Sequence, residues 1–173
     1  MDENGSLYVV NTDEGKVRRY RIGDTEGTVV AGGNGNGNRP NQLSGPRYVF
    51  VDRDHSVYVS DNENHRVMKW KEGAKQGIVV AGGQGQGNSL THLNRPMGVI
   101  VDQLGTVYVA DHENHRVMRW PKGATQGSVI VGGNGAGAQS NQINHPMGLS
   151  FDRHGNLYVA DNYNHRVQKF NIE

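Results

Sequence analysis

The chain has 173 residues, a formal net charge of +1 and 25 glycines. Its near-neutral charge argues against a dedicated nucleic-acid-binding domain, which typically carries an excess of basic residues. There is no cysteine, which excludes disulfides and thiolate metal sites and mildly favours a reducing compartment. No apolar run approaches the roughly 20 residues needed to span a bilayer. We therefore expect a soluble protein with no membrane partner and a slight preference for the cytoplasm.

The sequence repeats with a period of fifty residues. One column of the repeat holds aspartate at positions 2, 52, 102 and 152, and another holds tyrosine at 8, 58, 108 and 158. The block Asn-His-Arg-Val recurs at 64–67, 114–117 and 164–167. A period of this size is typical of solenoids and propellers, in which no unit buries its apolar face alone. We divide the single segment 1–173 into units 2–51, 52–101, 102–151 and a partial unit 152–173.

The elements follow the same order in each unit and are clearest in the third. Residues 97–102 and 106–110 are predicted strands joined by a tight turn that uses Gly105. A polar turn at 111–114 leads to a third strand at 115–120, and a fourth strand covers 128–131 before a glycine pair. A long Asn/Gly-rich loop then leads to the next unit. Its one large apolar residue is Leu43, Leu93 or Ile143, which we expect to fold inward between neighbouring units.

Local turn chemistry predicts two further features. The aspartate that opens each turn between the first and second strands should cap that turn through its side chain. His55 stands where the other units have Gly5, Gly105 and Gly155, so the same turn would require a positive φ at this histidine.

Short four-stranded antiparallel units with this much glycine predict an all-β fold, a β-propeller in which each sheet is one blade. The chain begins near Ser6 at the second strand of a blade and ends near Phe170 after a third strand. This gives fourteen strands, or about three and a half blades. Propellers typically have 4–8 blades, so we expect either a partial ring or a ring completed by a second chain.

The repeat resembles the NHL repeat. Residues 107–117 (VYVADHENHRV) and 157–167 (LYVADNYNHRV) are similar to that family's signature, and residues 57–67 (VYVSDNENHRV) fit as well. The resemblance implies a propeller, usually six-bladed, that acts as a binding platform. The first unit departs from the pattern with Asp-Glu-Gly-Lys at 13–16, and Tyr48 replaces the glycine found at 98 and 148.

Polar residues that recur in the turns of the second, third and fourth units are predicted to hold the fold together. The planar guanidinium of each repeated arginine should pair in bidentate fashion with the aspartate of its turn, although phosphate binding is the alternative. Each repeated histidine should act as a hydrogen-bonded strut between turns, because equivalent positions in successive blades lie on a circle rather than around one metal ion. The predicted network comprises Asp61, His65, Arg66, Asp111, His115, Arg116, Asp161, His165 and Arg166.

Binding specificity should come from positions that differ between the units. The polar turns and the long loops emerge on one face of an antiparallel propeller, and loops on a rigid scaffold commonly carry binding residues. The candidates in the turns and beside the prolines are Asn62, Glu63, His112, Glu113, Asn162, Tyr163, Arg47, Arg95, Met97, His145 and Met147.

These features favour a non-enzymatic scaffold that binds a partner protein through this face. The sequence assigns no catalytic residue, cofactor or metal site. Single-stranded RNA binding by the same face is one alternative, and it would need a basic surface with stacking aromatic side chains. A metal-dependent propeller lyase or hydrolase is the other alternative. Self-association that completes a ring is also considered.

Overall fold

The computed structural model describes residues 1–172, which form fourteen strands in four antiparallel sheets and three short 3-10 turns. This confirms the predicted all-β fold. The first sheet contains β1 (Leu7–Asn11), β2 (Lys16–Tyr20) and β3 (Thr28–Gly32). The second contains β4 (Pro46–Val51), β5 (Val57–Asp61), β6 (Arg66–Trp70) and β7 (Ile78–Gly82), with η1 (Asn62–Asn64) between β5 and β6.

The third and fourth sheets repeat this order. The third contains β8 (Pro96–Val101), β9 (Val107–Asp111), η2 (His112–Asn114), β10 (Arg116–Trp120) and β11 (Ser128–Gly132). The fourth contains β12 (Pro146–Phe151), β13 (Leu157–Asp161), η3 (Asn162–Asn164) and β14 (Arg166–Phe170). The predicted strands of the third unit differ from these bounds by about one residue. Each complete predicted unit begins at a turn, so it supplies three strands to one sheet and the first strand to the next.

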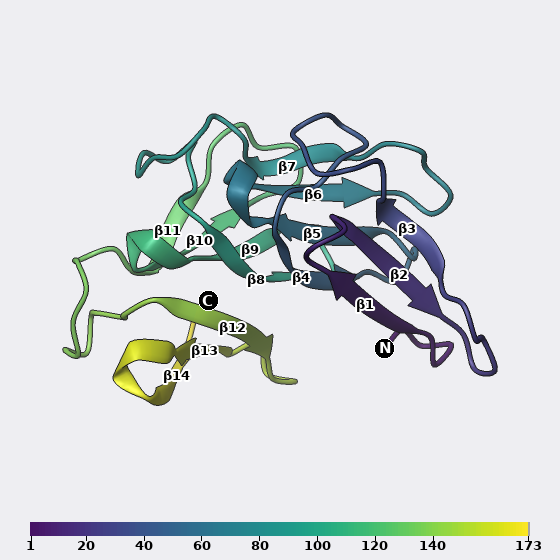
Figure 1. Ribbon diagram of the computed structural model, residues 1–173. Coiled ribbons are helices and arrows are strands. Elements are labelled where there is room, and N and C mark those ends of the chain that lie inside the picture. Colours follow the sequence, from purple (N-terminus) through teal and green to yellow (C-terminus); the bar gives the residue numbers. More distant parts are fainter. Residues whose placement is uncertain (173) are drawn as a thin grey trace.

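The sheets are arranged side by side as blades of a propeller, and their innermost strands face one another (Figure 1). β4 contacts β8, and β8 contacts β12, while β1 of the first sheet also lies against β4. The four sheets form an open arc rather than a closed ring (Figure 1). Completion of the ring by a second chain stays a prediction. None of the described residues forms a helix that is long and apolar enough to cross a membrane.

The hydrophobic core consists of three clusters, one between each pair of adjacent sheets. Each cluster also takes in one aliphatic residue from the long loop between its two sheets, and the side chains of Leu43, Leu93 and Ile143 are fully buried. The predicted inward-folding loop residue is therefore confirmed. At the outer face of the fourth sheet, Val167 is 68% exposed, whereas the equivalent Val67 and Val117 are fully buried. A sheet thus buries its apolar side chains only where another sheet covers them.

The turn between the first two strands of each blade is closed by an aspartate. In the third sheet, the backbone N–H of Thr106 donates to Asp102 Oδ1 at 2.8 Å, and the Tyr108 hydroxyl donates to Asp102 Oδ2 at 3.2 Å. The same pair of hydrogen bonds recurs at Asp2, Asp52 and Asp152. His55 adopts φ 55° in the second of these turns. Both turn predictions are confirmed, and the tyrosine column acquires a role that the sequence did not predict.

The first strand of the second, third and fourth sheets carries a bulge near its start. Pro96 pairs with Asp111 and Val99 pairs with Val109, so two residues of β8 lie opposite a single residue of β9. Gly98 lies in this bulge, where a Cβ atom would overlap the Met147 carbonyl oxygen of the next sheet. The close approach of β8 and β12 therefore requires glycine here. In β4, Tyr48 occupies this position and packs against the cluster between the second and third sheets.

The buried loop residue can be tested by truncation. Leu93→Ala should lower the free energy of unfolding by about 2–5 kcal/mol, because it leaves a cavity between the second and third sheets. Leu104→Ala is the matched control, since that side chain is 82% exposed, and it should change stability by less than about 0.5 kcal/mol. Urea unfolding measures both. Equal effects would contradict the role assigned to Leu93.

The Asp152 turn makes a separate prediction about pH. The side-chain hydrogen bond from Asn156 is the main cause that lowers the pKa of Asp152 from 3.8 to about 2. Because the folded-state pKa is depressed, the stabilising contribution of this carboxylate is present above its unfolded pKa and is lost as the pH falls toward 2. Asn156→Ala should raise the pKa of Asp152 toward 3.8, as measured by NMR titration of its carboxyl carbon. Gln103→Ala, in the turn of another sheet, should leave this pKa unchanged.

Candidate functional site

The polar turns and the long loops form one surface, as predicted. We call the turns η1, η2 and η3 together with loops 33–45, 83–95 and 133–145 the loop face. Each turn is joined to the preceding loop by a backbone hydrogen bond: Glu63 N–H to Ser44 O at 3.2 Å, Glu113 N–H to Asn94 O at 3.2 Å, and Tyr163 N–H to Asn144 O at 3.1 Å. The loop face is therefore a fixed part of the blades.

The repeated aspartate and arginine stabilise the loop face from within. Arg116 Nε donates to Asp111 Oδ2 at 2.6 Å, and the same contact measures 2.6 Å at Arg66–Asp61 and 2.7 Å at Arg166–Asp161. The predicted pairing with the aspartate is confirmed, but it is not bidentate, because only Nε contacts the carboxylate. The terminal nitrogens of Arg116 instead donate to the loop carbonyl oxygens of Asn88, Ser89 and His92. The reason is geometric: the loop curls over the guanidinium and presents three carbonyl oxygens to its terminal nitrogens.

This arrangement argues against phosphate binding by the repeated arginines. Arg66 and Arg116 are buried, and each guanidinium donates to one carboxylate and three backbone carbonyl groups. A phosphate would have to displace the loop to reach these donors. Arg166 makes equivalent contacts, but its side chain is 34% exposed because no further sheet covers it.

Burial and hydrogen bonding oppose each other at the three aspartates. At Asp61 and Asp111 burial raises the pKa, although Arg66 and Arg116, asparagine side chains and backbone N–H groups all favour the charged carboxylate. At Asp161 the cost of burial is smaller, and the hydrogen bonds from Asn164, Asn144 and Arg166 lower the pKa. At the two interior pairs the arginine is thus one of several donors that oppose the effect of burial on the pKa of the aspartate.

The repeated histidines act as struts at two of their three positions. His65 Nδ1 accepts a hydrogen bond from the Arg95 backbone N–H at 3.1 Å, and His115 Nδ1 accepts one from His145 N–H at 3.2 Å. Each bond joins a turn to the loop that enters the next sheet, whereas the predicted strut joined one turn to another. His165 follows the last turn, is exposed and has no such partner among residues 1–172. Burial is the main cause that lowers the pKa of His65 and His115, which favours neutral imidazoles.

The predicted binding residues fall into exposed and buried groups. Arg47, Glu63, Arg95, Glu113, Asn162 and Tyr163 are exposed, while His112, Met97, His145 and Met147 are half-buried. Asn62 departs from the prediction, since it is only 5% exposed and donates to Pro96 O at 3.1 Å. It joins the second and third sheets because the next blade closes directly over its turn. The binding roles of the accessible residues stay predictions.

The structure gathers four of these candidates at the junction of the third and fourth sheets. His145 Nε2 lies 3.7 Å from Glu113 Oε2, and His112 Nε2 lies 4.0 Å from Glu113 Oε1. The rings of Tyr163 and His145 are 4.2 Å apart between centroids. Burial is the largest cause that lowers the pKa of His112. Sequence reasoning selected these residues singly but did not join them.

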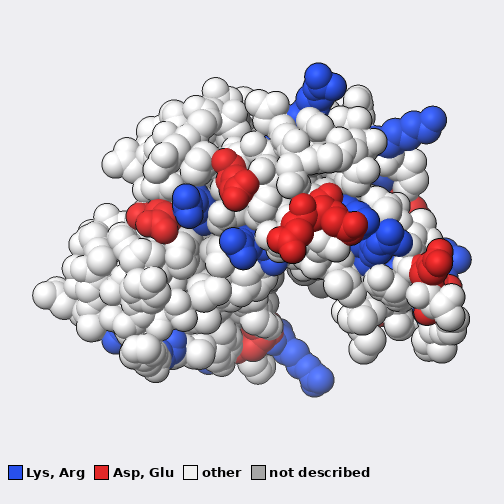
Figure 2. Space-filling view, viewed as in Figure 1, with Lys and Arg blue, Asp and Glu red and all other residues white. Residues whose placement is uncertain are grey.

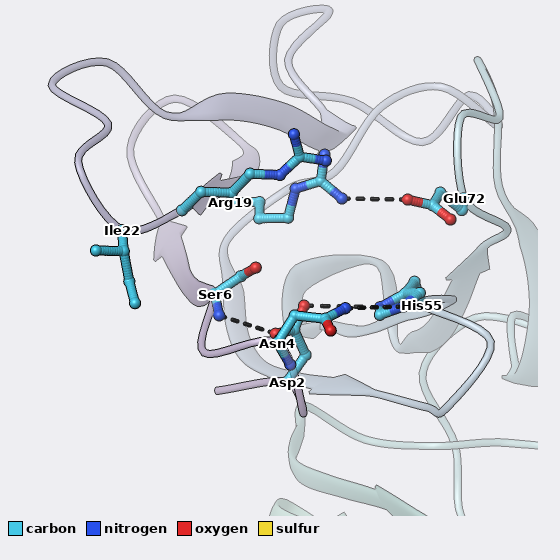
Figure 3. A pocket seen from close by; sticks show the side chains of 8 residues that line it. Asp2, Asn4, Ser6, Arg19, Ile22, His55 and Glu72 are labelled. Atoms are coloured by element: carbon cyan, nitrogen blue, oxygen red, sulfur yellow. Dashed lines mark hydrogen bonds and ion pairs between the residues drawn. The ribbon is translucent and has the colours of Figure 1, made fainter.

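A groove of about 330 Å³ at the junction of the first and second sheets was also missed (Figure 3). It lies beside the Asp2–Ser6 turn, at the opposite end of the blades from the loop face. Its charged side chains point toward one another: Arg19 Nη1 lies 3.2 Å from Glu72 Oε1, and His55 Nδ1 lies 3.6 Å from Asp2 Oδ2 (Figure 3). These residues occupy different columns of the repeat, so no sequence pattern connects them.

Comparison with known families agrees with the geometry of the blades. The family model of the NHL repeat matches residues 93–120 and 144–170. The first segment contains β8, β9, η2 and β10, and the second contains β12, β13, η3 and β14. The chain carries NHL repeats. No curated protein matches the sequence of this NHL-repeat chain.

Solved structures similar to the NHL-repeat chain share its fold. A protein of unknown function from Bacteroides thetaiotaomicron has a TM-score of 0.75 at 19% identity, with 97% of this chain and 44% of that chain covered. An auxiliary nutrient binding protein from the same species has a TM-score of 0.72 at 19% identity, with 96% and 45% covered. A streptogramin B lyase has a TM-score of 0.64 at 12% identity, with 97% and 51% covered. The chain therefore spans about half the length of these proteins.

The contribution of the buried Arg116–Asp111 pair to stability can be tested by comparing it with the more exposed Arg166–Asp161 pair. Arg116→Met should lower the free energy of unfolding by about 3–5 kcal/mol, because it leaves the buried Asp111 without its cation. Arg166→Met should cost clearly less, since that guanidinium is 34% exposed and Gln168 Nε2 also donates to Asp161 at 2.8 Å. Urea unfolding gives both values. A larger loss for Arg166→Met would refute this account.

Proposed function

We propose that this chain is a non-enzymatic part of an NHL-repeat propeller and binds a partner protein through its loop face. One observation carries the proposal. Most polar residues that recur in the turns of the second, third and fourth units are engaged in internal hydrogen bonds, whereas most of those that differ between units reach the surface of the same face. A scaffold that repeats and a surface that varies are what selective recognition needs.

The accessible residues have side chains suited to a protein interface. Tyr163 is 59% exposed and projects from η3, and Arg95 is exposed on the loop that enters β8. Tyrosine, arginine and methionine are enriched at protein–protein interfaces, and Met97 and Met147 lie partly exposed at the starts of β8 and β12. Backbone hydrogen bonds hold the turns in place, so little conformational entropy is lost when a partner binds.

The charge distribution supports a protein partner over RNA. Figure 2 shows basic and acidic side chains interspersed on the visible face, without a continuous basic surface. Nonspecific binding of single-stranded RNA uses a positively charged groove with aromatic side chains along it. On the loop face Tyr163 is packed against His145 rather than placed in a row of aromatic side chains. The metal-dependent lyase or hydrolase stays a prediction from the sequence.

The proposal predicts that a substitution on the loop face weakens partner binding. Proteins captured from RNase-treated extract by the immobilised chain would be identified, purified and titrated by biolayer interferometry. Tyr163→Ala should weaken binding about thirtyfold, as expected for loss of an aromatic hot spot worth about 2 kcal/mol. The fold should be unaffected because this side chain is largely exposed.

Ile22→Ala is the matched control, because Ile22 is 91% exposed and lies near the Asp2–Ser6 turn at the opposite end of the blades. It should leave the affinity unchanged. Equal weakening by both substitutions would contradict the assignment to the loop face. If the immobilised chain retained labelled mixed RNA in a salt-dependent way and captured no protein, the result would favour the RNA alternative and contradict the proposal.

A further inference from the structure

Three potential metal ligands converge at the junction of the third and fourth sheets. They are His112 and Glu113 on η2 and His145 on the loop before β12, and their ligand atoms all lie within 4.8 Å of one another. In a tetrahedral zinc site with bonds of 2.0–2.2 Å, ligand atoms are separated by about 3.4 Å. The distances of 3.7 and 4.0 Å between the Glu113 oxygens and the imidazole Nε2 atoms exceed this by less than 1 Å. Rotation of the exposed Glu113 side chain can close that difference.

Hydrogen bonding selects the tautomer of neutral His112 that can bind a metal through Nε2. His112 Nδ1 lies 3.1 Å from Pro146 O, and a carbonyl oxygen can only accept, so Nδ1 carries the hydrogen. In the neutral ring, Nε2 then presents its lone pair toward Glu113. The equivalent residues make the same donation, from Thr12 to Pro46 O at 2.9 Å and from Asn62 to Pro96 O at 3.1 Å. The donating role is thus built into this position of the repeat.

His145 has the same arrangement of its ring nitrogens. Its Nδ1 lies 2.7 Å from Asn144 Oδ1, which accepts the Nδ1 hydrogen and leaves the Nε2 lone pair facing Glu113. Metal-binding histidines commonly donate their second ring N–H to an oxygen in this way, which orients the ring and raises its basicity. His115, whose ring lies 4.4 Å from that of His145, is excluded because its Nδ1 already accepts the His145 backbone hydrogen.

The Glu113 carboxylate is the third electron-pair donor of the cluster, beside the two Nε2 atoms, and it accepts no hydrogen bond from the described part of the chain. No hydrogen bond among residues 1–172 reaches this carboxylate, although the equivalent Glu63 accepts one from the Ser44 hydroxyl at 2.6 Å. Asn94 replaces Ser44 at this junction, so that hydroxyl is lost. Two lone pairs and a carboxylate that face one another repel unless a proton or a metal cation lies between them. Arg95 also acts on His112 electrostatically, but its exposed charge is screened by solvent.

The preceding junction, between the second and third sheets, has the same backbone but a different set of side chains. Asn62 and Arg95 stand where this junction has His112 and His145, while the glutamate is present in both. Arg95 and His145 also share a left-handed backbone, with φ 50° and 51°. The shared geometry shows that the two histidines are not needed to close the blades.

We propose that His112 Nε2, His145 Nε2 and the Glu113 carboxylate bind a divalent transition-metal ion, with Zn²⁺ as the reference. Imidazole nitrogen combined with one carboxylate suits zinc and its neighbours rather than magnesium or calcium. Three protein ligands leave a fourth position open toward solvent, on the surface that we assign to partner binding. The site does not depend on that assignment, and we attach no reaction to it.

Isothermal titration of the metal-free chain with Zn²⁺ tests the site. We expect one equivalent to bind, and Co²⁺ should give a visible spectrum typical of four- or five-coordinate nitrogen and oxygen ligands. His112→Asn, His145→Arg and Glu113→Gln should each weaken binding about 100-fold or more. The first two substitutions copy the residues of the preceding junction, so the fold should be preserved, as checked by circular dichroism.

His154→Gln is the matched control, since this histidine is exposed on the Asp152 turn and lies outside the cluster; it should leave Zn²⁺ binding unchanged. Absence of a one-equivalent site would overturn the proposal. So would a double variant, His112→Asn with His145→Arg, that binds Zn²⁺ as tightly as the parent chain, because other surface histidines would then be responsible. A variant that loses Zn²⁺ binding but still binds the partner protein would show that the metal site and the proposed function are independent.

Discussion

Burial of apolar side chains between neighbouring sheets is the interaction on which the rest of the structure depends. Each of the three core clusters draws on two sheets and on one loop residue, Leu43, Leu93 or Ile143. A single sheet would leave this surface in water, as the exposure of Val167 on the last sheet illustrates. The same buried loop residue also holds the long loop against the turn beside it. Core packing therefore positions the loop face as well as the blades.

Polar residues divide into two groups according to what this packing leaves accessible. Asp111 and Arg116 lie where the loop covers them, so their hydrogen bonds are satisfied internally and nothing remains for a ligand. Tyr163 and Glu113 project from turns whose backbones are already held. The internal network makes the turns rigid, and this rigidity allows the exposed side chains to differ between blades without altering the fold.

The junction of the third and fourth sheets shows how little change is needed to convert a structural position into a candidate site. The position of His112 donates to a proline carbonyl group in the first three copies, whether it holds threonine, asparagine or histidine. Only histidine has a second ring nitrogen left to face Glu113 after making that bond. The additional chemistry thus arises from a side chain that still performs the structural role of its column.

The sequence by itself determined the period, the strands, the buried loop residue, the Asp152-type turns and the sharing of one face by turns and loops. These follow from alternation, turn chemistry and repetition, which act within one unit. Only the tertiary structure decided that Arg116 donates to loop carbonyl groups as well as to Asp111, instead of forming a bidentate pair. It also decided that Asn62 is buried and that His112, Glu113 and His145 lie together. Each of these depends on how one sheet is placed against the next, and that placement is set by side-chain packing between units rather than by any pattern within one of them.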